Sequence, residues 1–271
     1  MLTVIRPRRL VAVLTGAVVL LGAVSLTLNL LVLQAADSPA AGLLDLLSVN
    51  REGNLPTWFS SALTTSAAAA VAGVGAWAHR VRDRWRWHWT VLAAVFGYLS
   101  VDELVRLHER ANHQVGKVVE PTGVFTFGWW LLAAPLVLLF AAAYVRFLRG
   151  LPGRIGLLMV VAGTLYVGGA IGMEMVGSWL ADDRGTLLST PYVLATTAEE
   201  VFEMLGVVVF LYAVTTYANS RMTVVDVPVA PAAALPVQAP DRAGRGRGRA
   251  AAGAGTAPGA VDSDLGSSRA A

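Results

Sequence analysis

The sequence contains no cysteine and few charged residues. Without cysteine, disulfide bonds, thiolate metal sites and cysteine nucleophiles are excluded. Charged residues make up 14% of the chain, whereas a soluble domain carries about 25%, so the composition disfavours a soluble globular protein. The chain also lacks a phosphate-binding loop, a nucleophile elbow, a His-x-x-x-His zinc motif and a haem-type pair of histidines deep in two spans. No common catalytic motif therefore identifies a reaction.

Long hydrophobic runs are the main positive feature. Hydrophobic residues form 55% of the 271 residues, in runs of roughly 20, which is the length that crosses a ~30 Å hydrocarbon core. We predict an all-α polytopic membrane protein with six transmembrane helices, at residues 10–33, 57–78, 88–109, 126–148, 154–179 and 192–217. The first run could instead be a signal peptide, whose cleavage would leave five spans. Its apolar core exceeds the roughly 7–15 residues of such signals, so we interpret it as a span.

Charged residues alternate between the loops. Arginines dominate the N-terminal segment, the loops 79–87 and 146–154, and the segment after the last span, whereas acidic residues dominate the intervening loops. This is the positive-inside pattern, and it predicts that both termini are cytoplasmic. Because the chain is also rich in Ala, Arg and Gly, as in high-GC bacteria, we expect it in a bacterial plasma membrane.

The last part of the chain differs in composition from the rest. We predict a transmembrane domain over 1–218 and a disordered cytoplasmic tail over 219–271, which is rich in Ala, Pro, Gly and Arg. RNA or lipid binding by the tail arginines is an alternative, but we interpret them as solvated. Besides the bilayer, the expected partner is an unidentified small molecule or lipid, and no nucleic acid is expected.

Acidic and histidine residues collect near the outer ends of three predicted spans. The third span and its extension carry Asp102, Glu103, His108, Glu109 and His113, the fifth carries Glu174, and the sixth carries Glu199, Glu200 and Glu203. Charges in hydrocarbon cost several kcal/mol each, so such a cluster needs a metal, protons, arginine or water.

Helical spacing predicts how these residues meet. At 100° per residue, Asp102, Arg106, Glu109 and His113 would share one face of an uninterrupted third helix, with His108 pointing elsewhere unless the helix ends there. Glu199 and Glu203 are one turn apart, so we expect the third and sixth spans to touch through Asp102 and one of these glutamates. In the fifth span, Gly168 and Gly172 predict a small-residue face for close helix packing.

Three interpretations of the cluster remain open. The first is a divalent-metal site for Fe, Mn or Zn, acting on a lipid or small lipophilic substrate, because oxygen-rich ligation with one or two imidazoles suits these ions. The spacing departs from the Glu-x-x-His pattern of di-iron bundles. The second is a proton- or cation-coupled transporter. The third is a non-catalytic protein in which Arg106 and Arg110 neutralise a structural polar cluster. The sequence leaves open whether the protein is an enzyme.

Three motifs also carry a family resemblance. They are Glu-x-Asn-x-Pro-Thr-Trp-x-Ser from Glu52, Ser-x-Asp-Glu-x-x-x-x-His-Glu from Ser100, and Glu-Glu-x-x-Glu from Glu199. With them, the chain resembles, over residues 10 to 217, a family of uncharacterised multi-pass bacterial membrane proteins. The resemblance implies an architecture and a shared polar cluster but no reaction.

Overall fold

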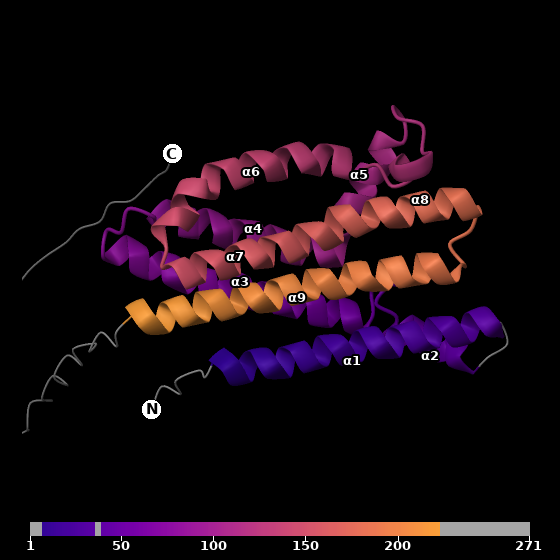
Figure 1. Ribbon diagram of the computed structural model, residues 1–271, viewed down its shortest axis with the longest axis horizontal. Helices are drawn as coiled ribbons and strands as arrows, with labels where there is room; N and C mark the ends of the chain where they lie inside the picture. Colours follow the sequence, from indigo (N-terminus) through magenta and orange to yellow (C-terminus); the bar gives the residue numbers. More distant parts are fainter. Residues whose placement is uncertain (1–6, 36–38, 223–271) are drawn as a thin grey trace, which may run out of the picture. The chain divides into compact units, whose positions relative to one another are not determined.

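The computed structural model describes residues 7–35 and 39–222, which form helices without any strand (Figure 1). The elements are α1 (Pro7–Gln34), α2 (Ala40–Leu47), α3 (Leu55–Arg80), α4 (Arg86–Val105), α5 (Leu107–Val115), the short 3-10 helix η1 (Gly123–Phe125), α6 (Trp130–Gly150), α7 (Gly153–Val167), the π-helical segment η2 (Gly168–Met173), α8 (Glu174–Arg184) and α9 (Thr190–Arg221). They belong to one compact unit, Met1–Val225. The predicted tail over 219–271 begins too early, because residues 219–221 are the last residues of α9. From residue 223 onward, the tail lies outside the described residues.

Five helical segments are long and apolar enough to cross a membrane. They are α1, α3, α6, the continuous segment Gly153–Arg184 that contains α7, η2 and α8, and α9. The chain is therefore an all-helical protein with the composition of an integral membrane protein. Helix α4, the third predicted span, is not among the five, although it packs along α3 (Figure 1). Polar residues at both of its ends, including His88, Asp102 and Glu103, reduce its hydropathy.

Two of the long helices begin at capping residues. The side chain of Asn54 accepts a hydrogen bond from the backbone N–H of Thr57 at 3.1 Å, and Pro56 lies in the first turn of α3. Ser189 caps α9 in the same way, by accepting from the N–H of Tyr192 at 3.4 Å. Each cap satisfies a backbone donor that the helix leaves free, and α3 begins two residues before the predicted span 57–78.

Helix α9 lies at the centre of the packing. It contacts α1, α3 and α7, whereas α6 packs mainly on α7 (Figure 1). The largest fully buried side chains include Trp89, Phe147 and Met204. Two of these rings, Trp89 and Phe147, meet edge to face with centroids 4.9 Å apart. An aromatic core therefore holds α4, α6 and α9 together.

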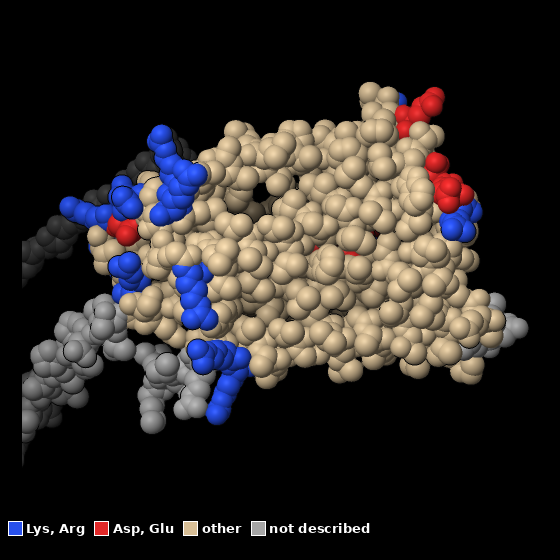
Figure 2. Space-filling model, viewed as in Figure 1, with Lys and Arg blue, Asp and Glu red and all other residues tan. Residues whose placement is uncertain are grey.

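The two ends of the bundle carry opposite charge. Figure 2 shows most Lys and Arg atoms at the end where α1 begins and α9 ends, which we call the arginine end. Its residues include Arg8, Arg9, Arg80, Arg82, Arg146, Arg149 and Arg221. Asp and Glu atoms are prominent at the opposite end, the acidic end, where α8 finishes at Asp182, Asp183 and Arg184. On the face drawn in Figure 2, the surface between the two ends shows no Lys or Arg atoms and only small areas of acidic atoms in its middle.

Candidate functional site

The third predicted span is interrupted at Arg106. Helix α4 ends at Val105, Arg106 adopts a left-handed conformation with φ 58°, and α5 begins at Leu107. This conformation costs a non-glycine residue roughly 1–3 kcal/mol, so surrounding contacts must hold it. The predicted continuous face of Asp102, Arg106, Glu109 and His113 is therefore wrong, because the change of direction separates its two halves.

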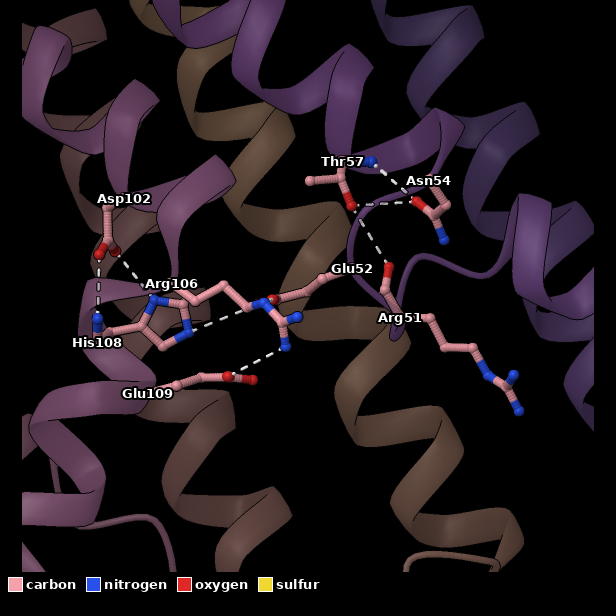
Figure 3. Close-up of polar contacts among 8 residues, drawn as sticks. All are labelled: Arg51, Glu52, Asn54, Thr57, Asp102, Arg106, His108 and Glu109. Carbon is pink, nitrogen blue, oxygen red and sulfur yellow. Dashed lines mark hydrogen bonds and ion pairs between the residues drawn. The ribbon is translucent and has the colours of Figure 1, made fainter.

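The interruption brings His108 back to Asp102 (Figure 3). One oxygen of Asp102 accepts the backbone N–H of His108 at 3.0 Å, and the other lies 3.0 Å from Nδ1 of its ring. Nε2 of the same ring lies 4.0 Å from Glu52. Arg106 forms ion pairs with Glu52 and, at 3.2 Å, with Glu109 (Figure 3). Both ring nitrogens of His108 thus face carboxylates, and we call these five residues the mouth network.

The charges of the mouth network determine the protonation of His108. Burial lowers the pKa of His108, but the hydrogen bond and charge of Asp102, with the charges of Glu52 and Glu203, raise it to about 9. His108 is therefore a cation at neutral pH. The pKa of Glu52 is also raised, because burial and Glu109 outweigh the opposing effects of Arg106 and His108. The network is an ion-pair cluster that fixes the turn between α4 and α5.

A second group of acids lies deeper, on α9 and its neighbours. Glu199, Glu200 and Glu203 occupy adjacent turns of α9 and are partly buried. Glu199 lies within electrostatic range of Glu174, the first residue of α8, and Glu203 lies within electrostatic range of Tyr166 on α7. No ion pair engages any of these acids within the described residues.

Close backbone packing positions these deeper acids. A Cβ atom placed on Gly169 would lie 2.8 Å from the carbonyl oxygen of Glu199 and 2.9 Å from Cγ of Glu203, so only glycine fits there. The predicted contact glycines, Gly168 and Gly172, have nothing within 4 Å of such an atom, so that prediction is wrong. The physical reason is the π-helical turn, which inserts a residue and rotates the contacting face.

The two groups of acids are electrostatically linked. Glu203 lies within electrostatic range of Glu103 and His108. The third and sixth predicted spans touch through Phe96 and Phe210, whose stacked rings lie 4.2 Å apart. The expected contact of these spans is therefore present at these rings, whereas Asp102 binds His108.

Serine and threonine residues fill the interface between α3 and α4. The hydroxyl groups of Ser61 and Ser100 lie 3.1 Å apart, those of Thr65 and Ser100 lie 2.6 Å apart, and Thr64 donates to the carbonyl of Ser60. These hydroxyl groups therefore mediate helix packing or bond to helix carbonyls. They offer no activated nucleophile.

The predicted metal ligands do not converge on one point. Among residues 7–35 and 39–222, no group of three or more His, Asp or Glu side chains could hold a metal ion. His113 is exposed on α5, and Glu109 is engaged by Arg106. The structure instead divides the predicted site into the mouth network and the deeper acids.

Sequence reasoning missed three residues of the site. Glu52 is not among the predicted ligands, although its place at the start of the Glu-x-Asn-x-Pro motif, beside a helix cap, is a signal that could have found it. The sequence contains no signal that would assign Tyr166 to the site, because an aromatic residue in an apolar span is ordinary. Thr197, one turn from Glu200, is 6% exposed, and its hydroxyl has no hydrogen-bond partner within the described part of the chain.

Comparison with known proteins gives one match. A family model described as a domain of unknown function (DUF8692) matches residues 11–217, which covers the helical bundle. No curated protein matches the chain, and no solved structure matches it.

Proposed function

The chain belongs to this family of unknown function, and we propose that it is a proton- or cation-coupled carrier of a bacterial plasma membrane. Its ion site would comprise Glu103, Glu174, Glu199, Glu200 and Glu203. The mouth network would form the outer entrance to this site. One observation carries the proposal: these five acids are all partly buried in the bundle, and within the described residues no ion pair engages any of them. The basic residue in electrostatic range of Glu203 is His108 at the mouth.

The proposed topology has six spans, with α4 as the third and both termini in the cytoplasm. Support comes from the alternation of helix directions and from the arginines at one end of the bundle (Figures 1 and 2). The chain lacks cysteine, so single cysteines placed at Asp83 and Glu120 can be labelled in intact cells. We expect an impermeant thiol reagent to label position 120 only. Labelling of position 83 from outside would reject this topology.

Cation uptake follows from the cost of burying like charges. Several carboxylates at one depth cannot all remain ionised in a low-dielectric region, so they must take up protons or another cation. The unpartnered hydroxyl of Thr197 adds a free polar group beside Glu200. Two helix interruptions, at Arg106 and at η2, flank the acids, and discontinuous helices are common at the ion sites of carriers.

The arrangement favours access from the acidic end. Toward the arginine end, α9 itself buries residues such as Val208, Val214 and Tyr217, and Tyr217 packs against Trp89. Polar groups do not continue through this aromatic core. We therefore propose that the described conformation exchanges ions with the outside, and that transport requires a second conformation.

Charge displacement after a pH step tests the proposal directly. Protein is reconstituted on a solid-supported membrane, and the pH on the acidic-end side is lowered. We expect a transient current from proton uptake, which Glu203→Gln and Glu199→Gln should abolish. Glu120→Gln is the matched control, because Glu120 is exposed in the loop before η1. If none of these variants alters the current, or if the wild type gives none, the carrier proposal is wrong.

The geometry of His108 supports one competing function, a divalent-metal centre acting on a lipid or small lipophilic substrate. Histidine ligands of metals usually donate their second ring nitrogen to a carboxylate, as Nδ1 of His108 can do with Asp102. Glu52, Glu103 and Glu203 would then complete the ligand set after side-chain rotation. Stoichiometric Fe, Mn or Zn in gently purified protein, with melting that chelation lowers, would favour this function. Absence of both metal and pH-step current would leave a structural role for the cluster.

A further inference from the structure

An apolar recess opens between α4 and α6, away from the acid cluster. It has a volume of about 440 Å³ and is lined by Trp87, His88, Val91, Leu136, Leu139, Phe140, Ala143 and Tyr144. Pockets that hold drug-sized ligands span roughly 300–1,000 Å³, so the recess is large enough for a substantial apolar group. It exists because α6 packs mainly on α7 and leaves the adjoining face of α4 uncovered.

The walls of the recess are apolar and accessible. Leu136 and Leu139 are 67% and 68% exposed, and Trp87 is 62% exposed. Trp87 lies in the first turn of α4, at the arginine end, where an indole ring suits a membrane interface. The recess therefore begins at the arginine-end surface and extends toward the middle of the bundle.

An arginine, Arg146, follows the apolar wall of the recess along α6. Leu139, Ala143 and Arg146 follow one another at spacings of four and three residues, so they share one face of α6. Arg146 is exposed and has no ion-pair partner within the described residues. An apolar channel that ends at an unpaired guanidinium complements a molecule with a hydrocarbon chain and an anionic head.

We propose that this recess binds an anionic phospholipid from the leaflet at the arginine end. One acyl chain would lie between α4 and α6, and the phosphate group would face Arg146. The site is separate from the acid cluster, because the stacked rings of Phe96 and Phe210 and the buried Trp89 lie between them. Lipid bound here would fix α6 against α4 and complete the packing of the bundle.

Native mass spectrometry with defined lipids tests this site. The purified protein receives phosphatidylglycerol or phosphatidylcholine with identical acyl chains, and the lipid-bound fraction is measured. We expect the wild type to retain phosphatidylglycerol preferentially. Arg146→Gln should weaken its binding about fivefold, as expected for one arginine near an anionic lipid surface. Ala143→Trp, which fills the recess, should remove the preference.

Two variants serve as matched controls. Arg9→Gln removes an exposed arginine at the same end but on α1, and Leu138→Trp adds an indole to a residue of α6 that is 70% exposed and outside the recess. Both should bind lipid as the wild type does. Equal retention of the two lipids, or phosphatidylglycerol preference unchanged in Ala143→Trp, would overturn the proposal. A wild-type dimer that Ala143→Trp converts to a monomer would also overturn it, because a second copy would then occupy the recess.

Discussion

The two halves of α9 pass through different surroundings. Toward the arginine end, Phe210 stacks on Phe96, and Tyr217 packs against Trp89 with ring centroids 4.9 Å apart. Toward the acidic end, Glu199 and Glu203 lie within electrostatic range of Glu174 and Tyr166. One helix thus joins an apolar, well-packed half to a polar half in which packing contributes less stability.

The difference extends to the backbone. The long helices are regular in the packed half, whereas the left-handed Arg106 and the π-helical η2 both lie beside the acids. At the junction, Gly206 of α9 meets α7 so closely that a Cβ atom would lie 2.8 Å from the backbone nitrogen of Tyr166. The packed half therefore anchors α9, and the polar half is where a change of protonation could alter helix contacts.

The largest expected effect comes from breaking the packed half at Trp89. Trp89 is fully buried and contacts both Phe147 and Tyr217, so Trp89→Ala should lower the free energy of unfolding by ~3–5 kcal/mol. Unfolding in mixed detergent–SDS micelles provides the measurement. Trp58→Ala is the control, since Trp58 is 64% exposed, and it should change stability little. Similar losses in the two variants would show that the aromatic core does not anchor the bundle.

A smaller effect is expected where the polar half is held by glycine. Gly169→Ala places a methyl group against Glu199 and Glu203 and should destabilise the protein by ~1–3 kcal/mol, as overpacking usually does. Gly168→Ala meets no atom within 4 Å and should stabilise it by up to about 1 kcal/mol, because alanine favours helix more than glycine. If α9 contacts Gly169, the melting temperature should fall in Gly169→Ala and rise in Gly168→Ala. A shift in the same direction in both variants would contradict the described packing.

The sequence predicted the helices better than it predicted the site. Membrane spans follow from apolar runs and their caps from local residues such as Asn54 and Pro56, so both can be read without tertiary contacts. The helix break at Arg106 could not be predicted from the sequence. Arginine rarely adopts a left-handed conformation, and here only the ion pairs of the mouth network favour it. The π-helical turn likewise depends on the contact with α9, and it moved the packing face from Gly168 to Gly169.

The same reasoning explains the partial success at the acid cluster. Burial cost predicted that the acids would need partners, and Asp102 has one in His108. The identity of the partner depends on helix rotation, and an uninterrupted 100° repeat gives the wrong rotation after either interruption. Asp102 therefore binds His108 across the break, and Glu103 is the acid of α4 that lies within electrostatic range of Glu203.

The smallest expected effect is a pH dependence confined to the mouth network. The pKa of His108 is raised from its ordinary value of 6.5 to about 9 in the folded protein. A raised histidine pKa means that folding favours the protonated ring, so this stabilisation is complete below about pH 6.5 and is lost as the pH rises through about 9. Because His108 and its partners are partly exposed, the loss should be up to about 1 kcal/mol.

Replacing His108 separates this contribution from the other titrating groups. His108→Asn should lower the melting temperature at pH 6 and leave it nearly unchanged at pH 10, so its difference from the wild type shrinks across this range. His113→Asn is the control, because His113 is exposed on the same short helix and no ion pair engages it within the described residues. A constant difference between His108→Asn and wild type at every pH would show that His108 acts by packing alone. A difference that shrinks with rising pH would show that protonated His108 stabilises the turn between α4 and α5 in the polar half.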